Sequence, residues 1–428
     1  MLRKLLALVA AILVLSLLGI TVAVARQRAP AIDGSNGKAP PLAWWSQKAI
    51  QGMFDYRVWS GARSGFITMF ARDGEIVYAT TAGYADVERR IPMTLDTPVR
   101  IASMTKPVTA VAAMSLVEDG LLGLDDPVSR YIPLAADLRV ATRHTRNPDG
   151  GFDSVPLSHP LLVRHLLMFA SGIGGNTSIG DDSDLEKLWQ EQGVGGGSGS
   201  LKERVERALT LPLFEQPGTL WRYGGSADVL ARVMEVAAGQ SFPEILEQRI
   251  FQPLGMSHTE HLPPPERQAD LARVYTQDEN GELVLAPKRI DEETDWTPGG
   301  GGLVSTVGDY MRFGLMLRGR GNLEGVKILE PETVAEMTRP HLASGVLVSE
   351  GLKGLGWGLG VSVVVDSEQS ITIDRDGDFW WAGYFGSYWA VSPEADLVGV
   401  VISQNEPGPY SDTPFEPGAA VSLALAGL

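Results

Sequence analysis

The sequence predicts a mixed α/β protein of the α+β kind, with an antiparallel sheet flanked by helices and a mainly helical inserted region. Two observations carry this prediction. Strand-like segments lie near both ends of the 428-residue chain, and the segment between them has helical patterns. We therefore expect one sheet built from both ends of the chain. The length suits two or three small domains, or one large core with an insertion.

A turn signal predicts the first pair of strands. The apolar run 66–72 is followed by Asp73-Gly74 and then by a second strand-like run, 75–80. Asp-Gly between two such runs is typical of a tight β-hairpin. Further strand-like runs near the other end of the chain occupy residues 360–365, 386–391 and 397–403.

Helical signals fill the middle of the chain and return before its last strands. Apolar residues fall on one face of 227–238, and Gly239 follows at the position of a C-terminal cap. Thr306 and Asp309 have the spacing of a capping box before a helix over 310–317.

The first residues indicate export or membrane anchoring. Arg3 and Lys4 precede an uncharged apolar run, 5–25, which is long enough to cross a bilayer as a helix. The run ends in Ala-Val-Ala, which is typical of a signal-peptidase site, so a cleaved signal and a retained membrane tether both stay open. The stretch 26–42 contains proline and glycine and is predicted to be a linker. We expect the folded part to work outside the cytoplasm, as a periplasmic, secreted or anchored protein.

Composition argues against several classes of function. The formal net charge of −16 disfavours nucleic-acid binding, because an acidic surface repels phosphate. The absence of cysteine removes disulfides, cysteine nucleophiles and thiolate zinc sites. The six histidines include no H-E-x-x-H pair, which argues against a zinc hydrolase. We expect no metal and no other cofactor.

Ser103 and Lys106 form an S-x-x-K pattern just before a predicted helix over 109–117. Residues three apart lie on one helical face, and free backbone N–H groups surround a serine at a helix N-terminus. A lysine amine in a low-dielectric site loses affinity for its proton, and it can then take the hydroxyl proton and create a nucleophile. The short pattern also fits an N-capping serine beside a solvent-facing lysine. A second copy, 35–38, lies in the predicted linker, where nothing would hold it in place.

Several other segments accompany this motif in a familiar order. They cover residues 74–87, 97–133, 163–173, 217–242, 249–259, 298–317 and 383–404. Together with the S-x-x-K pattern they resemble the β-lactamase and penicillin-recognising serine hydrolase family, in its class C and family VIII esterase branch. The resemblance covers nearly everything from residue 50 to 405. It implies a β-lactamase/DD-peptidase-like fold, with the active site between the α/β part and the helical part.

The expected organisation follows from these segments. It comprises a signal peptide or membrane anchor over 1–25, a linker over 26–42 and a hydrolase domain over 43–428. Within that domain we expect an α/β part over about 43–120 and 298–428 and a helical part over about 121–297.

The resemblance also implies a catalytic tyrosine. The family's second element is Y-x-N, and this chain has Tyr223-Gly224-Gly225 at that place, just before a helix. A phenol beside Lys106 could carry the proton from Ser103 to the leaving group and later activate water. Gly225 departs from the pattern, since it lacks the asparagine amide that helps to hold the lysine and the substrate. This departure counts against β-lactam substrates and leaves the nucleophile unaffected.

At the third element, where many relatives have K-T-G or H-x-G, the chain has Trp381-Ala382-Gly383-Tyr384. The glycine lets the backbone approach a substrate closely. By resemblance, the backbone N–H groups of Ser103 and Tyr384 would form the oxyanion hole. No cationic side chain stands here to hold a substrate carboxylate. The aromatic side chains of this region suggest an aromatic-lined cleft, to which Trp381, Tyr384 and Tyr388 would contribute, with Trp380 and Trp389 expected in the sheet core instead.

The function that we expect is a serine hydrolase that forms an acyl-enzyme through Ser103 and cleaves a small carboxylic ester or related amide. The chain has no G-x-S-x-G and so no nucleophile elbow of the α/β-hydrolase kind. One alternative is β-lactamase or D-Ala-D-Ala carboxypeptidase-like activity. Another is a non-hydrolytic, membrane-tethered binder of cell-wall peptide or protein, although a pure binder would not need Ser103, Lys106 and Tyr223 together. His165, His258 and His261 are expected to be structural.

Overall fold

A computed structural model describes residues 39–175, 181–193, 199–261, 263, 268–287, 296–342, 353–370, 375–407 and 415–428. The predicted signal or anchor, 5–25, lies outside these residues, as do most of the predicted linker and the second S-x-x-K copy. Among the helices of the described ranges, none is long and apolar enough to cross a membrane.

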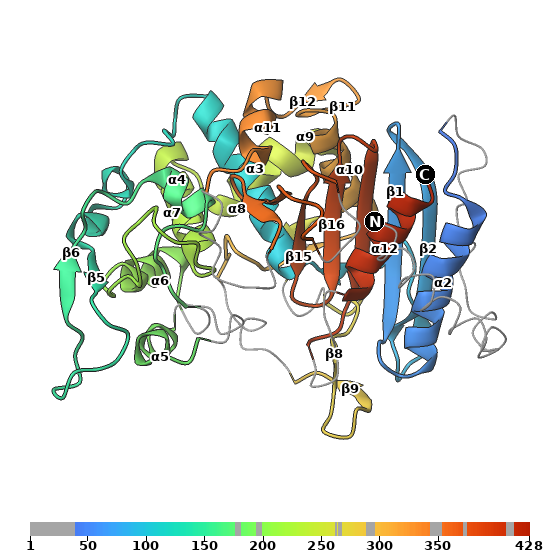
Figure 1. Ribbon diagram of the computed structural model, residues 1–428, viewed down its shortest axis with the longest axis horizontal. Coiled ribbons are helices and arrows are strands. Elements are labelled where there is room, and N and C mark those ends of the chain that lie inside the picture. The colour runs from blue at the N-terminus through green and yellow to red at the C-terminus, as the bar shows by residue number, and fades with distance from the viewer. Residues whose placement is uncertain are drawn as a thin grey trace.

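An eight-stranded antiparallel sheet forms the framework, with the strand order β13-β14-β15-β16-β17-β1-β2-β3 (Figure 1). Its strands are β1 (Gly65–Arg72), β2 (Glu75–Asp86), β3 (Ile91–Pro92), β13 (Leu355–Trp357), β14 (Ser362–Val364), β15 (Phe379–Gly383), β16 (Ser387–Ser392) and β17 (Leu397–Ser403). Strand β1 pairs with β2 on one side and with β17 on the other. The prediction that both ends of the chain build one sheet is therefore confirmed.

The predicted hairpin is the β1–β2 turn. Asp73 and Gly74 have φ angles of 53° and 78°. A two-residue turn with positive φ at both positions matches the right-handed twist of the flanking strands, and Asp-Gly tolerates those angles. The Asp-Gly pair therefore predicted the turn because it tolerates the positive φ angles that this turn requires.

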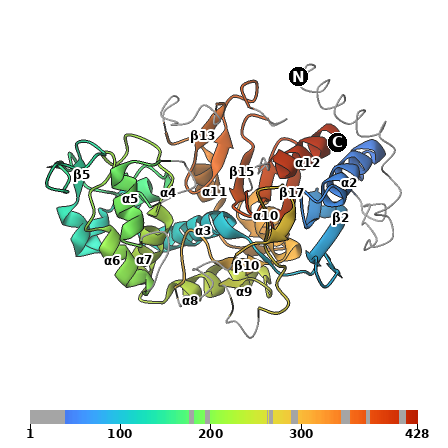
Figure 2. The same cartoon turned by 90° about the horizontal axis from the view of Figure 1, so that it is seen from below.

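Helices cover both faces of the sheet (Figure 2). Helices α2 (Trp44–Trp59) and α12 (Phe415–Ala426) pack against each other on one face, and α10 (Val307–Arg318) packs on the other. The α2 face also buries Ala39 and Leu42, which were predicted to be linker. The backbone N–H of Ala39 donates to the Glu75 carboxylate at 2.9 Å, so residues 39–42 belong to the folded part.

The rest of the described chain is mainly helical and also contains short strands. Its helices are α3 (Thr105–Glu118), α4 (Val163–Leu167), α5 (Asp184–Glu191), α6 (Leu201–Ala208), α7 (Ser226–Ala238), α8 (Phe242–Leu246), α9 (Gln252–Leu254) and α11 (Pro331–Thr338), with a π-helical turn over Glu247–Phe251. Short 3-10 turns occupy Ala102–Met104, Val128–Arg130 and Pro133–Asp137. The short strands are β4 (Val99–Arg100), β5 (Arg139–Ala141), β6 (Ser154–Pro156), β7 (Glu260–His261), β8 (Tyr275–Gln277), β9 (Leu283–Leu285), β10 (Leu303–Ser305), β11 (Asn322–Leu323) and β12 (Val326–Lys327).

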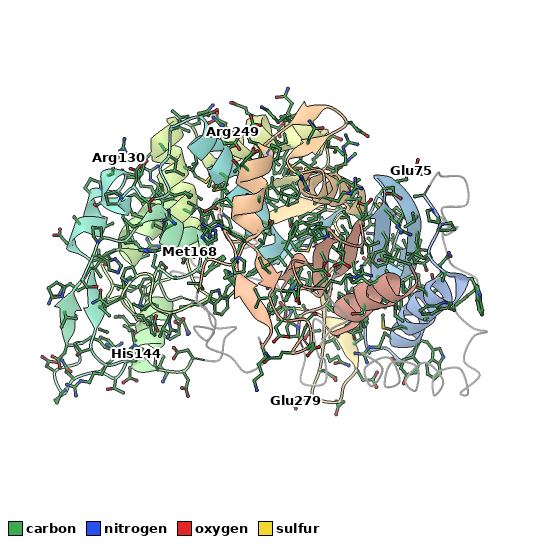
Figure 3. The ribbon with its side chains drawn as sticks, turned by 45° about the horizontal axis from the view of Figure 1, so that its top comes forward. Glu75, Arg130, His144, Met168, Arg249 and Glu279 are labelled. Atoms are coloured by element: carbon green, nitrogen blue, oxygen red, sulfur yellow. The ribbon has the colours of Figure 1, made fainter. Side chains whose placement is uncertain are left out.

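The predicted C-terminal cap is present, and the predicted capping box is present in its Thr306 half, since the Asp309 carboxylate accepts from His258 and Thr259 instead. Helix α7 ends at Gly239, whose φ of 67° is the left-handed conformation of a C-terminal cap. The Thr306 side chain accepts the backbone N–H of Asp309 at 3.2 Å and so begins α10. Figure 3 shows the two sides of the molecule, with Arg130 and His144 on the helical side and Glu75 at the far end beside α2.

Helix α3 lies at the centre of the molecule, between the helical side and the sheet (Figure 2). Every residue from Thr105 to Leu116 is buried. A helix that is buried all round carries no polar face, which explains its Ala- and Val-rich sequence. The N-terminal end of this central helix is where the motif residues gather.

Candidate active site

Ser103 lies in the tight turn that leads into α3. The turn is attached to the β4–β10 strand pair, because the backbone N–H of Ile101 donates to the Leu303 carbonyl at 3.0 Å. The Tyr310 hydroxyl donates to the Met104 carbonyl at 2.7 Å. Ala102 has a φ of 46°, which residues with a side chain rarely adopt. The backbone around Ser103 is thus held on both sides in an uncommon conformation.

Lys106 is buried one helical turn later, so the alternative of a solvent-facing lysine is excluded. Its Nζ donates to Ser103 Oγ at 3.1 Å and to the Gly300 carbonyl at 2.6 Å. The same Nζ lies 4.6 Å from the centre of the Tyr223 ring. These contacts leave the amine little freedom to turn away from the serine.

Tyr223 completes the group, because its hydroxyl donates to Ser103 Oγ at 2.7 Å. It lies in the loop before α7, which is fixed against residues 169–174. A Cβ at Gly224 would lie 2.2 Å from the Ile173 carbonyl oxygen, so only glycine fits there. The backbone N–H of Gly225 donates to the Gly174 carbonyl at 3.0 Å. The structure therefore brings together the three side chains that the sequence singled out.

Two residues that the sequence analysis did not single out support this group. The Gly300 carbonyl accepts a hydrogen bond from Lys106 Nζ, and the Gly300 N–H donates to Asp228 Oδ1 at 2.9 Å. Desolvation raises the pKa of Asp228, and this effect is opposed by the Gly300 N–H and the Lys106 charge. Both residues lie in segments that carry the family resemblance, but one sequence gives no sign of such contacts between them.

The predicted third element lies beside the nucleophile. A Cβ at Gly383 would lie 2.5 Å from the Ile101 carbonyl oxygen, so the end of β15 touches the turn that carries Ser103. Tyr384, the next residue, is 37% exposed, whereas Trp381 is only 6% exposed. The oxyanion role of the Ser103 and Tyr384 N–H groups stays a prediction.

Trp381 belongs to an aromatic cluster around Tyr223. Its ring stacks on Phe169 with centroids 5.8 Å apart and meets Trp357 edge-on at 5.1 Å. Trp221 stacks on Tyr223 at 6.0 Å and contacts Trp357 at 4.4 Å. These rings pack closely around Tyr223, whose hydroxyl contacts Ser103 Oγ.

The expectation that Tyr388 lines the same cleft is wrong. Neighbouring residues of a strand point to opposite faces of the sheet. Tyr388 stacks on Trp380 at 5.1 Å, and both pack with the core on the α2 face. Trp389 is fully buried against α10, as expected of a core residue.

The three histidines have structural surroundings. His165 Nδ1 accepts the backbone N–H of Leu162 at 3.2 Å, and His261 packs against Phe242. Burial lowers the pKa of each of these two histidines to about 4. His258, which is 70% exposed, lies beside Asp309 at the start of α10.

Comparison with known proteins agrees with this geometry. A family model described as Beta-lactamase matches residues 50–419. Protein Rv1367c of Mycobacterium tuberculosis is 32% identical over 375 residues, which cover 85% of this chain and 90% of that protein. Esterase EstB of Burkholderia gladioli is 31% identical over 376 residues, which cover 83% and 89%.

A solved structure has the same fold. EstCE1, described as a hydrolase with promiscuous acyltransferase activity, superposes with a TM-score of 0.75 at 27% identity and covers 90% of this chain and 99% of its own. The expected β-lactamase/DD-peptidase-like fold is confirmed. With a family model over most of its length and relatives above 30% identity, the chain belongs to the Beta-lactamase family.

Proposed function

We propose that this protein is a carboxylesterase-like serine hydrolase that cleaves esters through an acyl-enzyme on Ser103. The observation that carries the proposal is the pair of contacts to Ser103 Oγ, from Lys106 Nζ at 3.1 Å and from the Tyr223 hydroxyl at 2.7 Å. A nucleophile within reach of two proton-transfer groups is what acyl transfer requires. The relatives named as an esterase and a hydrolase support the same class of reaction.

The reaction begins when the Lys106–Tyr223 pair accepts the hydroxyl proton and Ser103 Oγ bonds to the ester carbonyl carbon. The oxyanion that forms is stabilised by the backbone N–H groups of Ser103 and Tyr384, each contributing on the order of 3 kcal/mol. The pair then returns the proton to the alcohol oxygen as the ester C–O bond breaks. Water repeats the sequence, so the acid leaves and the Ser103 hydroxyl is restored.

Labelling with a fluorophosphonate tests the nucleophile. We expect the reagent to modify Ser103 alone, and Ser103→Ala to abolish both labelling and turnover of a short p-nitrophenyl ester while the protein stays folded. Ser35→Ala, in the second S-x-x-K copy, should keep both activities. Wild-type turnover by Ser103→Ala would contradict the assignment. A folded wild type that neither labels nor turns over any ester would favour the non-hydrolytic binder.

The side chains near the nucleophile favour a neutral ester over a β-lactam. Burying an unpaired carboxylate is costly, and neither Trp381 nor Ala382 can pair with one. Gly225 offers no side-chain amide, whereas an apolar substrate gains contact with Tyr384, which is 37% exposed in front of the buried Trp381 cluster.

We therefore expect kcat/KM for a short neutral ester to exceed that for nitrocefin by at least about tenfold, or roughly 1.4 kcal/mol. Both substrates are measured on one preparation. Comparable or reversed values would contradict this preference.

We also propose that the protein acts outside the cytoplasm, on the strength of the apolar run 5–25 and the small-residue pattern at its end. N-terminal sequencing of the exported protein distinguishes a cleaved signal from a retained tether. Full-length protein found only in the cytoplasm would contradict both forms.

A further inference from the structure

Asp228 is connected to Lys106 through a single residue of backbone. Its Oδ1 accepts the Gly300 N–H at 2.9 Å, and the Gly300 carbonyl accepts from Lys106 Nζ at 2.6 Å. Asp228 lies in the first turn of α7, five residues after Tyr223, whereas Lys106 lies in the first turn of α3. The link thus joins α3, which carries Lys106, to α7, which follows the loop that carries Tyr223.

The loop that makes this link is clamped from both sides. A Cβ at Gly299 would lie 2.2 Å from the Ala227 carbonyl oxygen, so the loop presses on the first turn of α7. Thr109 Oγ1 donates to the Gly299 carbonyl at 2.7 Å, which ties the same loop to α3. A Cβ at Gly300 would lie 3.3 Å from Lys106 Nζ. The amine therefore rests directly on this backbone.

Among the described residues, two charged side chains act on Asp228. Desolvation raises the pKa of Asp228, while the Gly300 N–H, Lys106 on α3 and Arg204 on α6 act in the opposite direction. His261 on β7 lies behind the loop, 3.8 Å from where a Cβ of Gly302 would be, and its pKa of about 4 keeps it neutral at pH 7. Ser103 Oγ and the Tyr223 ring also contact the amine.

We propose that Asp228 is a positioning residue that acts through the Gly300 peptide to hold Lys106 against Ser103. The carboxylate fixes the peptide, and the peptide carbonyl takes one amine hydrogen, so the amine stays directed at the hydroxyl. This inference rests on the proposed function, since it concerns the activation of Ser103.

The chain offers a matched control in Asp309. This residue occupies the same turn of α10 as Asp228 does of α7, and it accepts the His258 N–H at 2.8 Å and the Thr259 hydroxyl at 2.9 Å. It therefore binds loop groups in the same way, and within the described part of the chain its hydrogen bonds go to residues 258, 259 and 306 rather than to the Ser103 group. A purely structural role for Asp228 would give its variants the behaviour of Asp309 variants.

The experiment measures the rate of Ser103 labelling by a fluorophosphonate from pH 5 to 9, with melting temperature alongside. In Asp228→Ala the peptide loses its anchor, and we expect labelling to slow by at least about tenfold. In Asp228→Asn the amide oxygen still accepts the Gly300 N–H. The rate of Ser103 labelling at the plateau of the pH–rate profile should therefore stay within roughly threefold of wild type. The acid limb of that variant's pH–rate profile should move to lower pH by at least about half a unit, because the variant removes a carboxylate beside the group of side chains that activates Ser103.

Asp309→Asn should lower the melting temperature and leave both the rate and the acid limb unchanged. An unshifted acid limb in Asp228→Asn, or wild-type labelling by Asp228→Ala, would overturn the inference. If Asp228→Ala fails to fold, the acid limb of the pH–rate profile of Asp228→Asn is sufficient to test the inference. Absence of labelling in the wild type contradicts the proposed function itself, whereas normal wild-type labelling with unaltered Asp228 variants overturns only the positioning role.

Discussion

The phenol of Tyr223 can be removed while its ring stays in place. Tyr223→Phe keeps the stacking on Trp221 and the contact with Phe169 but loses the bond to Ser103 Oγ. We expect kcat for a short ester to fall by about 10²- to 10⁴-fold, with little change in KM, because the lost group moves a proton. Steady-state kinetics check this.

Tyr78→Phe is the control, because the Tyr78 hydroxyl donates to the Gln47 carbonyl on the α2 face, remote from the site. Its kcat should match the wild type. A Tyr223→Phe enzyme with wild-type kcat would show that Lys106 alone carries the proton.

Ala102 stores strain beside the nucleophile. Its φ of 46° costs a residue with a side chain about 1–2 kcal/mol, and glycine avoids that cost. Glycine in turn loses roughly 0.5–1 kcal/mol of chain entropy on folding. Urea unfolding should therefore find Ala102→Gly at least as stable as the wild type. Ala113→Gly, within buried α3, should lose about 1 kcal/mol or more, and equal losses at the two positions would argue against strain.

Contacts within the catalytic group were predictable from the sequence where the two residues are close together along the chain. Ser103 and Lys106 lie three apart, so their proximity follows from helical geometry. The bond from Gly300 to Asp228 joins positions 72 apart, and the bond from Lys106 to Gly300 spans 194 positions. No local pattern specifies such pairs, because they depend on how α7 and the 299–300 loop pack on α3.

At the level of elements, β15 must lie close to the Ser103 turn. Gly383→Ala would put a Cβ 2.5 Å from the Ile101 carbonyl oxygen and 2.3 Å from Ser387 Oγ, so the strand must move away. We expect a loss of about 1–3 kcal/mol in unfolding free energy. We also expect up to about a hundredfold loss in kcat/KM, since a displacement near 1 Å misaligns the reacting groups.

Gly52→Ala is the matched control. Gly52 lies inside α2, and a Cβ there would have no atom within 4 Å. The alanine should stabilise the protein by roughly 0.5–1 kcal/mol and leave kcat/KM unchanged. If Gly383→Ala keeps wild-type kinetics, β15 does not define the site.

Strand positions were predicted better than strand faces. The runs 386–391 and 397–403 agree closely with β16 and β17, because alternation and turn residues are local signals. Tyr388 was assigned to the cleft although it faces α2. The face that a strand presents to the site depends on the whole sheet, and a shift of one residue exchanges the two faces.

At the level of the whole molecule, the sheet built from both chain ends was predictable and its internal order was not. Strand-like runs at 66–80 and 360–403 predicted a common sheet. The pairing of β1 with β17, and the central burial of α3, are consequences of long-range packing. The short pairs β5–β6 and β8–β9 have only three residues per strand, too few for a periodic signal.

The folded molecule keeps two histidines neutral, and this makes it sensitive to mild acid. Burial lowers the pKa of His165 and of His261 from 6.5 to about 4. In the unfolded chain both would bind a proton near pH 6.5, so below that pH the unfolded state holds more protons than the native state. The stability that each neutral histidine contributes is therefore complete above pH 6.5 and is lost as the pH falls toward 4.

Urea unfolding at pH 7, 6 and 5 measures this loss. Each histidine should remove roughly 1.4 kcal/mol of unfolding free energy per pH unit within the window from 6.5 to 4. Asp228 and Glu186, whose pKa values are raised by desolvation, act with the opposite sign as the pH falls. The comparison of wild type with His165→Gln cancels their contribution, because both proteins contain them. The variant should lose about 1.4 kcal/mol less per pH unit than the wild type. Equal slopes for the two proteins would mean that His165 binds a proton as easily in the folded state as in the unfolded chain.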